Sequence, residues 1–320
     1  MKRSKSNDAA LHSIAPLVLV APRMRVLYTP TPKAACTTIK MMLATAEGTR
    51  NSDVVDRLAV MHVSRAQTIH HPQVNGLSTL ADFSARDKRH MLTSPDWLRV
   101  TSVRDPISRA YSAWENRIFM RAHRRTTTLI ELAHDVRTDG RVDLAASFAH
   151  FAKVLGEKAD VFMTDHHFLP QTNLARPDVI DYDTLVRVDQ PGEIDALARV
   201  LTARSGKPIV PERLNEGLGV RVERVCDIHT ANRLMATYAS DYEAFDFPRR
   251  DWAPSVEPLL LSDMEARMLG NYRRAFERAV SVAREAQRRT GARYGVRQMR
   301  RAITKVARLE NSATRPKETF

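Results

Sequence analysis

The chain contains 320 residues, of which 43% are hydrophobic and 27% are charged, and its formal net charge is +13. This composition predicts a globular protein with a substantial core, and the positive charge indicates acidic partners such as nucleotides, anionic polysaccharides, nucleic acids or membrane surfaces. Two cysteines are too few for a disulfide framework or a four-cysteine zinc site, and no apolar run approaches the roughly 20 residues that cross a bilayer.

The N-terminal residues 1–13 are polar, and we expect them to be disordered. A basic start is followed by the apolar run Ile14 to Ala21, which is short, contains Pro16 and lacks a cleavage site of small residues. These features do not fit a secretory signal, and together with the low cysteine content they predict a cytoplasmic location.

The first predicted unit is a strand over 24–28, a loop with two prolines, and a helix over 36–47. Lys33, Thr37 and Thr38 fall where the loop meets the first helical turn, whose free N–H groups and positive dipole end favour an anion. The stretch contains no glycine, so it is not a Walker A loop. Taken alone, it fits either an anion cradle or an ordinary capped helix start.

The next part of the chain is less regular. Residues 51–65 carry apolar side chains at helical spacing, whereas 68–75, with two adjacent histidines and a proline, are predicted to form a loop. Residues 80–91 are predicted to form a short helix or turn that leads to the next strand.

A second strand–loop–helix unit covers 97–103, Arg104 and the helix 107–121. The strand is apolar enough to be buried, and the aspartate and proline after Arg104 suit the N-cap and the first helical position. Ser112 lies two turns into the helix. An arginine fork with a hydroxyl could hold a phosphate group, although a capped helix with a surface arginine would have the same residues.

Further elements alternate in the same way, with helices over 142–155, 191–205 and 230–247 and a strand within 179–187. Alternating strands and helices predict an α/β fold with a central parallel sheet and helices on both faces. Ligands bind such sheets at the carboxyl ends of the strands, which is where Lys33 and Arg104 fall.

The C-terminal part, 261–307, is predicted to form one or two basic helices with a break at Thr290-Gly291 or Tyr294-Gly295. These basic residues could simply form a solvated helix face, or they could bind an anionic membrane surface or an acidic partner. Few aromatic residues accompany the basic ones, so no specific nucleic acid is expected. The predicted organisation is a disordered N-terminus (1–13), a main domain (14–250), a basic helical extension (251–310) and a tail (311–320).

The two units together resemble a known cofactor signature. The patterns P-K-x-x-C-T-x-x-K, starting at Pro32, and V-R-D-P-x-x-R-x-x-S-A, starting at Val103, resemble those of the carbohydrate sulfotransferase family, which includes chondroitin, dermatan and HNK-1 sulfotransferases and bacterial relatives. Segments at 167–171, 182–189 and 238–245 resemble later family segments, although the first has phenylalanine in place of tryptophan and the second ends in an approximately placed aspartate. The resemblance spans about 24–247.

The resemblance implies a P-loop-like three-layer fold and a donor, 3′-phosphoadenosine 5′-phosphosulfate (PAPS), with no metal. It also implies two sets of binding residues. The 5′-phosphosulfate set is Lys33, Ala34, Ala35, Cys36, Thr37 and Thr38, and the 3′-phosphate set is Arg104 and Ser112.

Sulfuryl transfer requires a cation at the leaving phosphate and a base near the attacking hydroxyl. Lys33 is the predicted cation. Relatives carry a base histidine between the two motifs, which makes His70 the preferred choice. The full set of candidate bases is His62, His70, His71, His166 and His167. No H-E-x-x-H spacing supports a metal site instead.

The sequence therefore predicts a bacterial, PAPS-dependent sulfotransferase that acts on a hydroxyl of a carbohydrate or glycolipid in the cytoplasm, with possible attachment to a membrane. Two other hypotheses stay open. One is a kinase-like phosphotransferase, against which stand the missing Walker A glycines and the lack of a Mg²⁺ motif. The other is a non-catalytic basic adaptor that binds nucleic acid or membrane. The acceptor is expected to be set by loops within 118–141 and 165–176.

Overall fold

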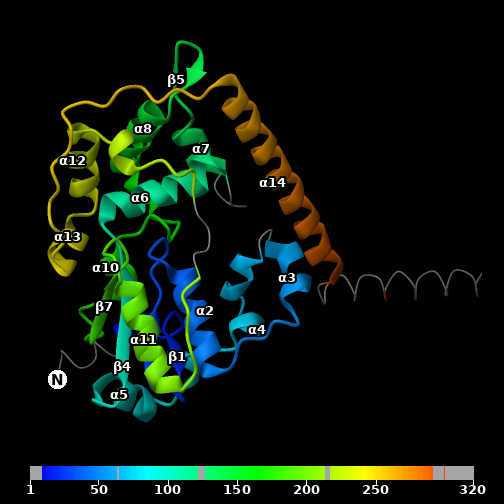
Figure 1. The fold of residues 1–320 in the computed structure, drawn as a ribbon, viewed down its shortest axis with the longest axis vertical. Helices are drawn as coiled ribbons and strands as arrows, with labels where there is room; N and C mark the ends of the chain where they lie inside the picture. Colours follow the sequence, from blue (N-terminus) through cyan, green and yellow to red (C-terminus); the bar gives the residue numbers. More distant parts are fainter. Residues whose placement is uncertain (1–8, 63–64, 122–126, 213–216, 291–298, 300–320) are drawn as a thin grey trace, which may run out of the picture.

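The structure is a computed structural model that describes residues 9–62, 65–121, 127–212, 217–290 and 299. Residues 9–14 are helical, and the predicted tail lies outside the described residues. The architecture is α/β, with a sheet and its flanking helices in one part and a group of helices packed beside it (Figure 1).

A five-stranded sheet forms the centre, in the order β3-β1-β2-β4-β7. Its strands are β1 (Leu19–Ala21), β2 (Val26–Thr29), β3 (Ser78–Thr79), β4 (Leu98–Val103) and β7 (Thr184–Arg187). The pairs β2·β4 and β4·β7 are parallel, whereas β1 is antiparallel to both of its neighbours. The predicted α/β class is confirmed, with a parallel centre and one antiparallel side.

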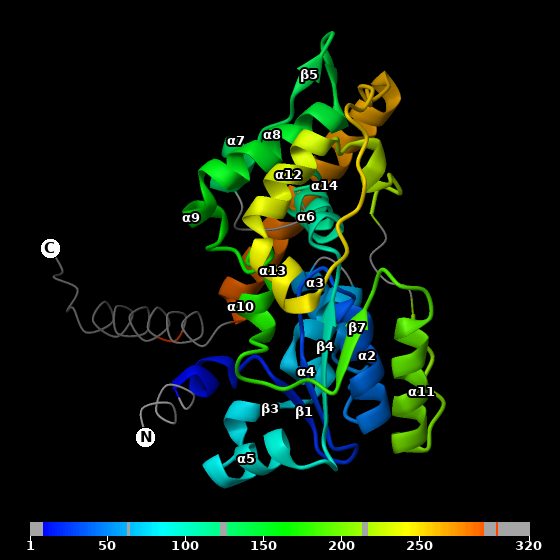
Figure 2. The same cartoon turned by 90° about the vertical axis from the view of Figure 1, so that its left-hand side faces the viewer.

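Alternation along β2 places its side chains on the two faces of the sheet. Val26 and Tyr28 belong to the apolar cluster under α2 and α11, whereas Leu27 packs on the opposite side with Trp97. The helices on these faces are α2 (Cys36–Glu47), α11 (Glu193–Ser205) and α5 (Ala85–Thr93), the last preceded by η2 (Leu80–Asp82). Figure 2 shows α2 and α11 together beside the sheet.

Several other helices form a second layer with an aromatic core, in which Trp114, Phe148 and Phe151 are fully buried. Its members are α6 (Pro106–Trp114), α7 (Thr127–Leu132), α8 (Leu144–Glu157), α9 (Ala159–Phe162), α10 (Gln171–Ala175), η4 (Val222–Arg224), α12 (Ile228–Thr237) and α13 (Ala239–Phe245). A small hairpin, β5 (Arg137–Thr138) and β6 (Arg141–Val142), turns at an Asp-Gly pair with positive φ at both residues.

Two of the predicted elements are wrong in detail. The segment 68–75 is not a loop but contains two short helical pieces, η1 (Ala66–His70) and α4 (Pro72–Asn75), because the Asn75 amide donates to the carbonyls of Ile69 and His71. The segment 230–247 is two helices rather than one. They are separated at Tyr238, whose buried hydroxyl donates to the Phe168 carbonyl.

The predicted helix 107–121 is α6 followed by a π-helical turn, η3 (Glu115–Phe119). The helix predicted within 51–65 is α3 (Val55–His62).

The C-terminal helix α14 (Asp263–Thr290) has 28 residues and runs along the outside of the molecule to α3 (Figure 1). Its residues Leu269 and Val280 are buried against the rest of the protein. No helix in the described ranges is long and apolar enough to cross a membrane.

Candidate active site

The loop after β2 turns sharply without glycine. Lys33 and Ala35 both have left-handed backbone conformations, with φ of 68° and 54°, and α2 begins at the next residue, Cys36. A left-handed conformation costs a non-glycine residue roughly 1–2 kcal/mol. Strain of this kind is concentrated at ligand and catalytic sites, so the loop conformation is itself a functional indication.

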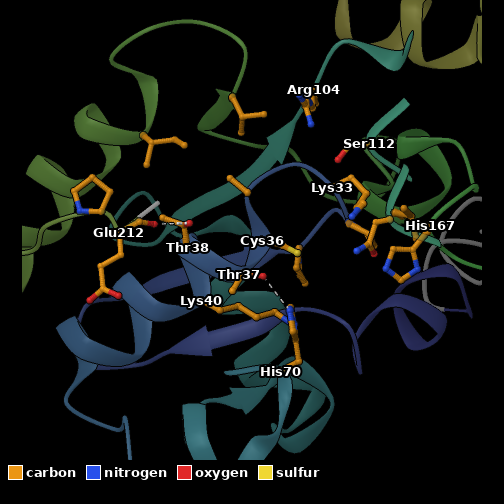
Figure 3. A pocket seen from close by; sticks show the side chains of 18 of the residues that line it. Lys33, Cys36, Thr37, Thr38, Lys40, His70, Arg104, Ser112, His167 and Glu212 are labelled. Atoms are coloured by element: carbon orange, nitrogen blue, oxygen red, sulfur yellow. Dashed lines mark hydrogen bonds between the residues drawn. The ribbon is translucent and has the colours of Figure 1, made fainter. Parts of the chain in front are cut away.

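A cavity of about 1140 Å³ lies at the carboxyl ends of the parallel strands, and both sequence motifs line it (Figure 3). The predicted donor residues in its wall are Lys33, Ala35, Cys36, Thr37, Thr38, Arg104 and Ser112. The remaining predicted residue, Ala34, is fully buried behind the loop. The parallel pairing of β2 with β4 brings the two motifs to the same edge of the sheet.

The ammonium group of Lys33 is shielded from solvent. Burial lowers its pKa from the ordinary value to about 8, while the nearby Cys36 and Glu115 act in the opposite direction. At neutral pH the side chain is still protonated, and a buried ammonium group of this kind favours an anionic ligand that restores its pKa.

Thr38 has a structural bond as well as a place in the wall. Its hydroxyl donates to the Glu212 carbonyl oxygen over 2.9 Å, which ties the start of α2 to the segment after α11. Thr37 faces His70, whose Nε2 lies 3.1 Å from the threonine hydroxyl.

The other ring nitrogen of His70, Nδ1, lies 3.2 Å from Nζ of Lys40, one helical turn further along α2. An ammonium group can only donate, so Nδ1 of His70 is the acceptor and Nε2 carries the hydrogen that Thr37 accepts. Burial lowers the pKa of Lys40, and the nearby Cys36 opposes that shift.

The tip of β4 is held by two segments that are distant in the sequence. Gln171 accepts from the Arg104 N–H through Oε1 and donates to the Arg104 carbonyl through Nε2, over 2.9 and 2.8 Å. The fully buried Asp241 accepts from the Gln171 backbone N–H over 2.8 Å. The Arg104 side chain donates from Nε to Asp189 over 3.1 Å. These contacts fix the backbone that presents Arg104 to the cavity.

A third part of the wall comes from η3 and the segment before α10. Asp165 accepts from Nδ1 of His167 over 2.8 Å and from Nε of Arg117 over 3.0 Å, and Nη2 of Arg117 adds a second bond. Burial lowers the pKa of His167 to about 3. Burial alone would raise the pKa of Asp165, but the hydrogen bond from His167 and the Arg117 charge outweigh it and hold that pKa below its ordinary range.

A comparison with protein families decides the class of this site. The model of the sulfotransferase family matches residues 16–248. The chain belongs to the sulfotransferase family. Comparisons with curated proteins and with solved structures gave no match. The match covers both motifs and the later segments, so the cavity described above is the candidate active site of a sulfotransferase.

The other histidine candidates lie in different places. His166 lines the cavity and is exposed, whereas His71 accepts from the Gln73 N–H at the start of α4 and is absent from the cavity wall among the described residues. The His62 side chain lies outside what the structure describes.

Sequence reasoning missed Asn116 and Arg117 in the wall of the sulfotransferase cavity, and it missed Asp165, which bonds the wall residues Arg117 and His167. Asn116 and Arg117 reach the wall because η3 is a π-helical turn, a local irregularity that is common at functional sites and that helical spacing does not reveal. An available signal was the aspartate two residues before His167, since that spacing is typical of a side chain that caps its own turn.

Asp165, His166 and His167 also bring potential metal-ligand atoms within 4.8 Å of one another. However, Asp165 is already bonded to the Arg117 guanidinium and to His167, and a cation next to a carboxylate disfavours a second cation there. We interpret this group as a hydrogen-bond relay. The absence of a metal stays a prediction.

Proposed function

We propose that this sulfotransferase takes PAPS as its donor and transfers the sulfuryl group to a hydroxyl of a carbohydrate or glycolipid in the cytoplasm. The observation that carries the proposal is the meeting of the strained Lys33 loop with Arg104 and Ser112 in one cavity. Two cationic places in one cavity suit a donor with two separate anionic groups. The cysteines of the described chain, Cys36 and Cys226, are unpaired, which supports a reducing compartment.

In this mechanism Lys33 and the first turn of α2 stabilise negative charge that develops on the leaving 5′-phosphate, and Arg104 with Ser112 binds the 3′-phosphate. The acceptor oxygen forms a bond to sulfur as the bond from sulfur to the phosphate oxygen breaks, and a histidine of the cavity takes the hydroxyl proton. These side chains accelerate the transfer through their positions and charges, because the protein holds them in place before the reaction begins.

Binding of the desulfated product, adenosine 3′,5′-bisphosphate, tests the donor. We expect calorimetry to show binding in the presence of a chelator, because the cavity supplies its own cations. Binding of ATP that requires Mg²⁺, without binding of the bisphosphate, would instead support a kinase-like phosphotransferase.

Replacing Lys33 by alanine tests the chemistry. We expect Lys33→Ala to lose roughly several hundredfold in the rate of sulfate transfer from labelled PAPS, as when one charge partner of a transition state is removed. Lys88→Ala is the matched control, since Lys88 is a half-buried lysine on α5 that does not line the cavity. A folded Lys33→Ala protein that transfers sulfate at the rate of the unmodified enzyme would disprove the mechanism.

A further inference from the structure

Two cavity histidines, His70 and His167, have neighbours that favour different roles. His70 accepts a hydrogen bond from Lys40 at Nδ1, as described above. A proton added to this ring would replace that bond and place an imidazolium 3.2 Å from an ammonium group. The Lys40 ammonium group therefore opposes the protonation that His70 would undergo as a general base.

Burial, Arg117 and His166 disfavour the protonated ring of His167, but unlike His70 this ring has a carboxylate partner that stabilises it. Its Nδ1 donates to Asp165 over 2.8 Å, which fixes the tautomer and leaves Nε2 as the nitrogen that accepts a proton. The Asp165 carboxylate stabilises the imidazolium that forms, in the manner of a histidine–aspartate pair. Arg117 holds the same carboxylate in place through Nε and Nη2.

His167 also lies in the part of the cavity that contains the predicted donor residues Lys33 and Ser112. Figure 3 shows it on the same side as Lys33 and Ser112, apart from the group of Thr37, His70 and Lys40. Burial lowers its pKa to about 3, so the ring is neutral at physiological pH. The anionic groups of a bound donor oppose this shift. The charged or titratable groups around the ring, among the described residues, are Asp165, Arg117 and His166.

We infer that His167, oriented by Asp165 and Arg117, accepts the proton of the acceptor hydroxyl, and that His70 positions Thr37 at the donor loop. This assignment rests on the proposed function. During transfer the acceptor oxygen forms its bond to sulfur, the bond from sulfur to the phosphate oxygen breaks, and the hydroxyl proton moves to Nε2 of His167. Asp165 and Arg117 act through His167 and are positioning residues.

Paired substitutions of the two histidines test the inference. We expect His167→Ala to lower kcat for sulfate transfer by roughly a hundredfold or more, with the Kd for adenosine 3′,5′-bisphosphate changed less than threefold, since a general base contributes about 10²–10⁴-fold to the rate. We expect His70→Ala to raise that Kd about tenfold and to change kcat much less. Asp165→Asn should lower kcat without weakening bisphosphate binding.

The outcomes separate the two levels of inference. Lack of sulfate transfer by the unmodified protein would contradict the proposed function. If the unmodified protein is active, a His167→Ala enzyme that keeps its kcat, or a His70→Ala enzyme that loses kcat while binding the bisphosphate normally, would overturn the assignment. Rescue of His167→Ala by added imidazole would support it, because a structural defect does not respond to a diffusible base.

A second inference concerns α14 and is independent of the chemistry. Four of the large hydrophobic side chains exposed in the described structure lie on one face of this helix. Met264, Met268 and Tyr272 follow one another at intervals of four residues, and Val282 lies five full turns beyond Met264. Their exposed fractions are 66%, 63%, 42% and 61%. We call these four residues the α14 stripe.

Beside the α14 stripe runs a row of exposed arginines, Arg267, Arg274 and Arg278, at spacings of seven and four residues. The opposite side of α14 packs on the protein, where Leu269 and Val280 are buried. The outward surface of α14 is therefore an apolar stripe with arginines along one side, and the exposed Glu265 lies on the other side. An apolar stripe beside basic side chains is typical of helices that lie on membranes with anionic lipids.

We propose that the α14 stripe binds the surface of a bilayer that contains anionic lipid, with the arginine row on the headgroups and Met264, Met268 and Tyr272 at the acyl boundary. A second copy of the chain is a weaker fit. In a twofold pair around the stripe, the arginine rows of the two copies would lie close together and repel one another.

Vesicle co-sedimentation of the full chain tests this surface. We expect binding to vesicles of phosphatidylcholine with phosphatidylglycerol and little binding to phosphatidylcholine alone. The double change Arg274→Glu with Arg278→Glu should weaken binding at least tenfold, since each basic residue near such a surface contributes about 1 kcal/mol. Met268→Glu should also weaken binding at least tenfold, because it places a negative charge in the apolar stripe, against the anionic lipid. Arg199→Glu, an exposed change on α11, is the matched control.

Equal binding by the variants and the unmodified chain would overturn the proposal, because the lipid would then be held elsewhere. So would light scattering that shows a dimer which Met268→Glu dissociates, with no binding to either vesicle. Unchanged binding of adenosine 3′,5′-bisphosphate by each variant confirms that the fold is intact.

Discussion

At the residue scale, Lys33 determines how the cavity responds to pH. Its pKa of about 8 in the free protein lies within an accessible range. Because a bound anion raises that pKa, the protonated lysine binds the anion and the neutral lysine does not. Affinity for adenosine 3′,5′-bisphosphate is therefore full below pH 8 and falls as the pH rises through it.

We expect the Kd for the bisphosphate to rise about tenfold between pH 7 and pH 9, by proton linkage at a single group. Calorimetry across that range measures the effect. Lys33→Met should bind weakly with little dependence on pH. A pH dependence that persists unchanged in Lys33→Met would assign the titration to another group, such as Lys40.

At the scale of elements, the sequence could predict how the motifs meet but not what holds them. The strand β4 and the helices α2 and α6 follow from local patterns, and parallel pairing then places Lys33 and Arg104 at one edge. The contacts of Gln171 with Arg104, and of Asp241 with Gln171, join segments about 70 residues apart, so no local pattern indicates them.

Side-chain contacts that no local pattern indicates also explain why the predictions for 68–75 and 230–247 are wrong. The break between α12 and α13 coincides with a bond from Tyr238 to Phe168, and the helical pieces within 68–75 are stabilised by the side chain of Asn75. Periodicity reports which side of an element is apolar, but tertiary contacts of this kind decide where it ends.

The two hydrogen bonds between Gln171 and the Arg104 backbone at the end of β4 lead to a prediction. Gln171→Ala leaves the partly buried N–H and carbonyl of Arg104 without their present partner, which costs about 1–3 kcal/mol in the free energy of unfolding. Because Arg104 is then less well placed, we expect the Kd for adenosine 3′,5′-bisphosphate to rise about tenfold. Asn173→Ala, an exposed change on the same helix α10, should alter neither quantity. Normal bisphosphate binding by a destabilised Gln171→Ala protein would show that the contact is only structural.

At the scale of the whole molecule, α14 is joined to the rest of the protein by a specific polar contact as well as by apolar packing. Arg273 makes two bonds to Asp135, of 2.6 and 3.0 Å, donates from Nε to the Phe119 carbonyl over 2.9 Å, and stacks over the Phe119 ring. Trp252, in the segment before α14, is buried in the same helical core. The predicted division at residue 250 stays a prediction, but the residues beyond it contribute to the core.

This contact predicts how strongly α14 stabilises the fold. The ion pair of Arg273 and Asp135 is largely buried, with side-chain exposures of 12% and 19%, so Arg273→Ala leaves a desolvated carboxylate and a carbonyl without their donor. We expect a loss of about 2–3 kcal/mol in the free energy of unfolding, measured by denaturant titration. The matched change Arg274→Ala removes an exposed arginine that bonds its neighbour Asn271, and it should cost less than about 0.5 kcal/mol. Equal stability of the two variants would mean that α14 rests on the protein by apolar contact alone.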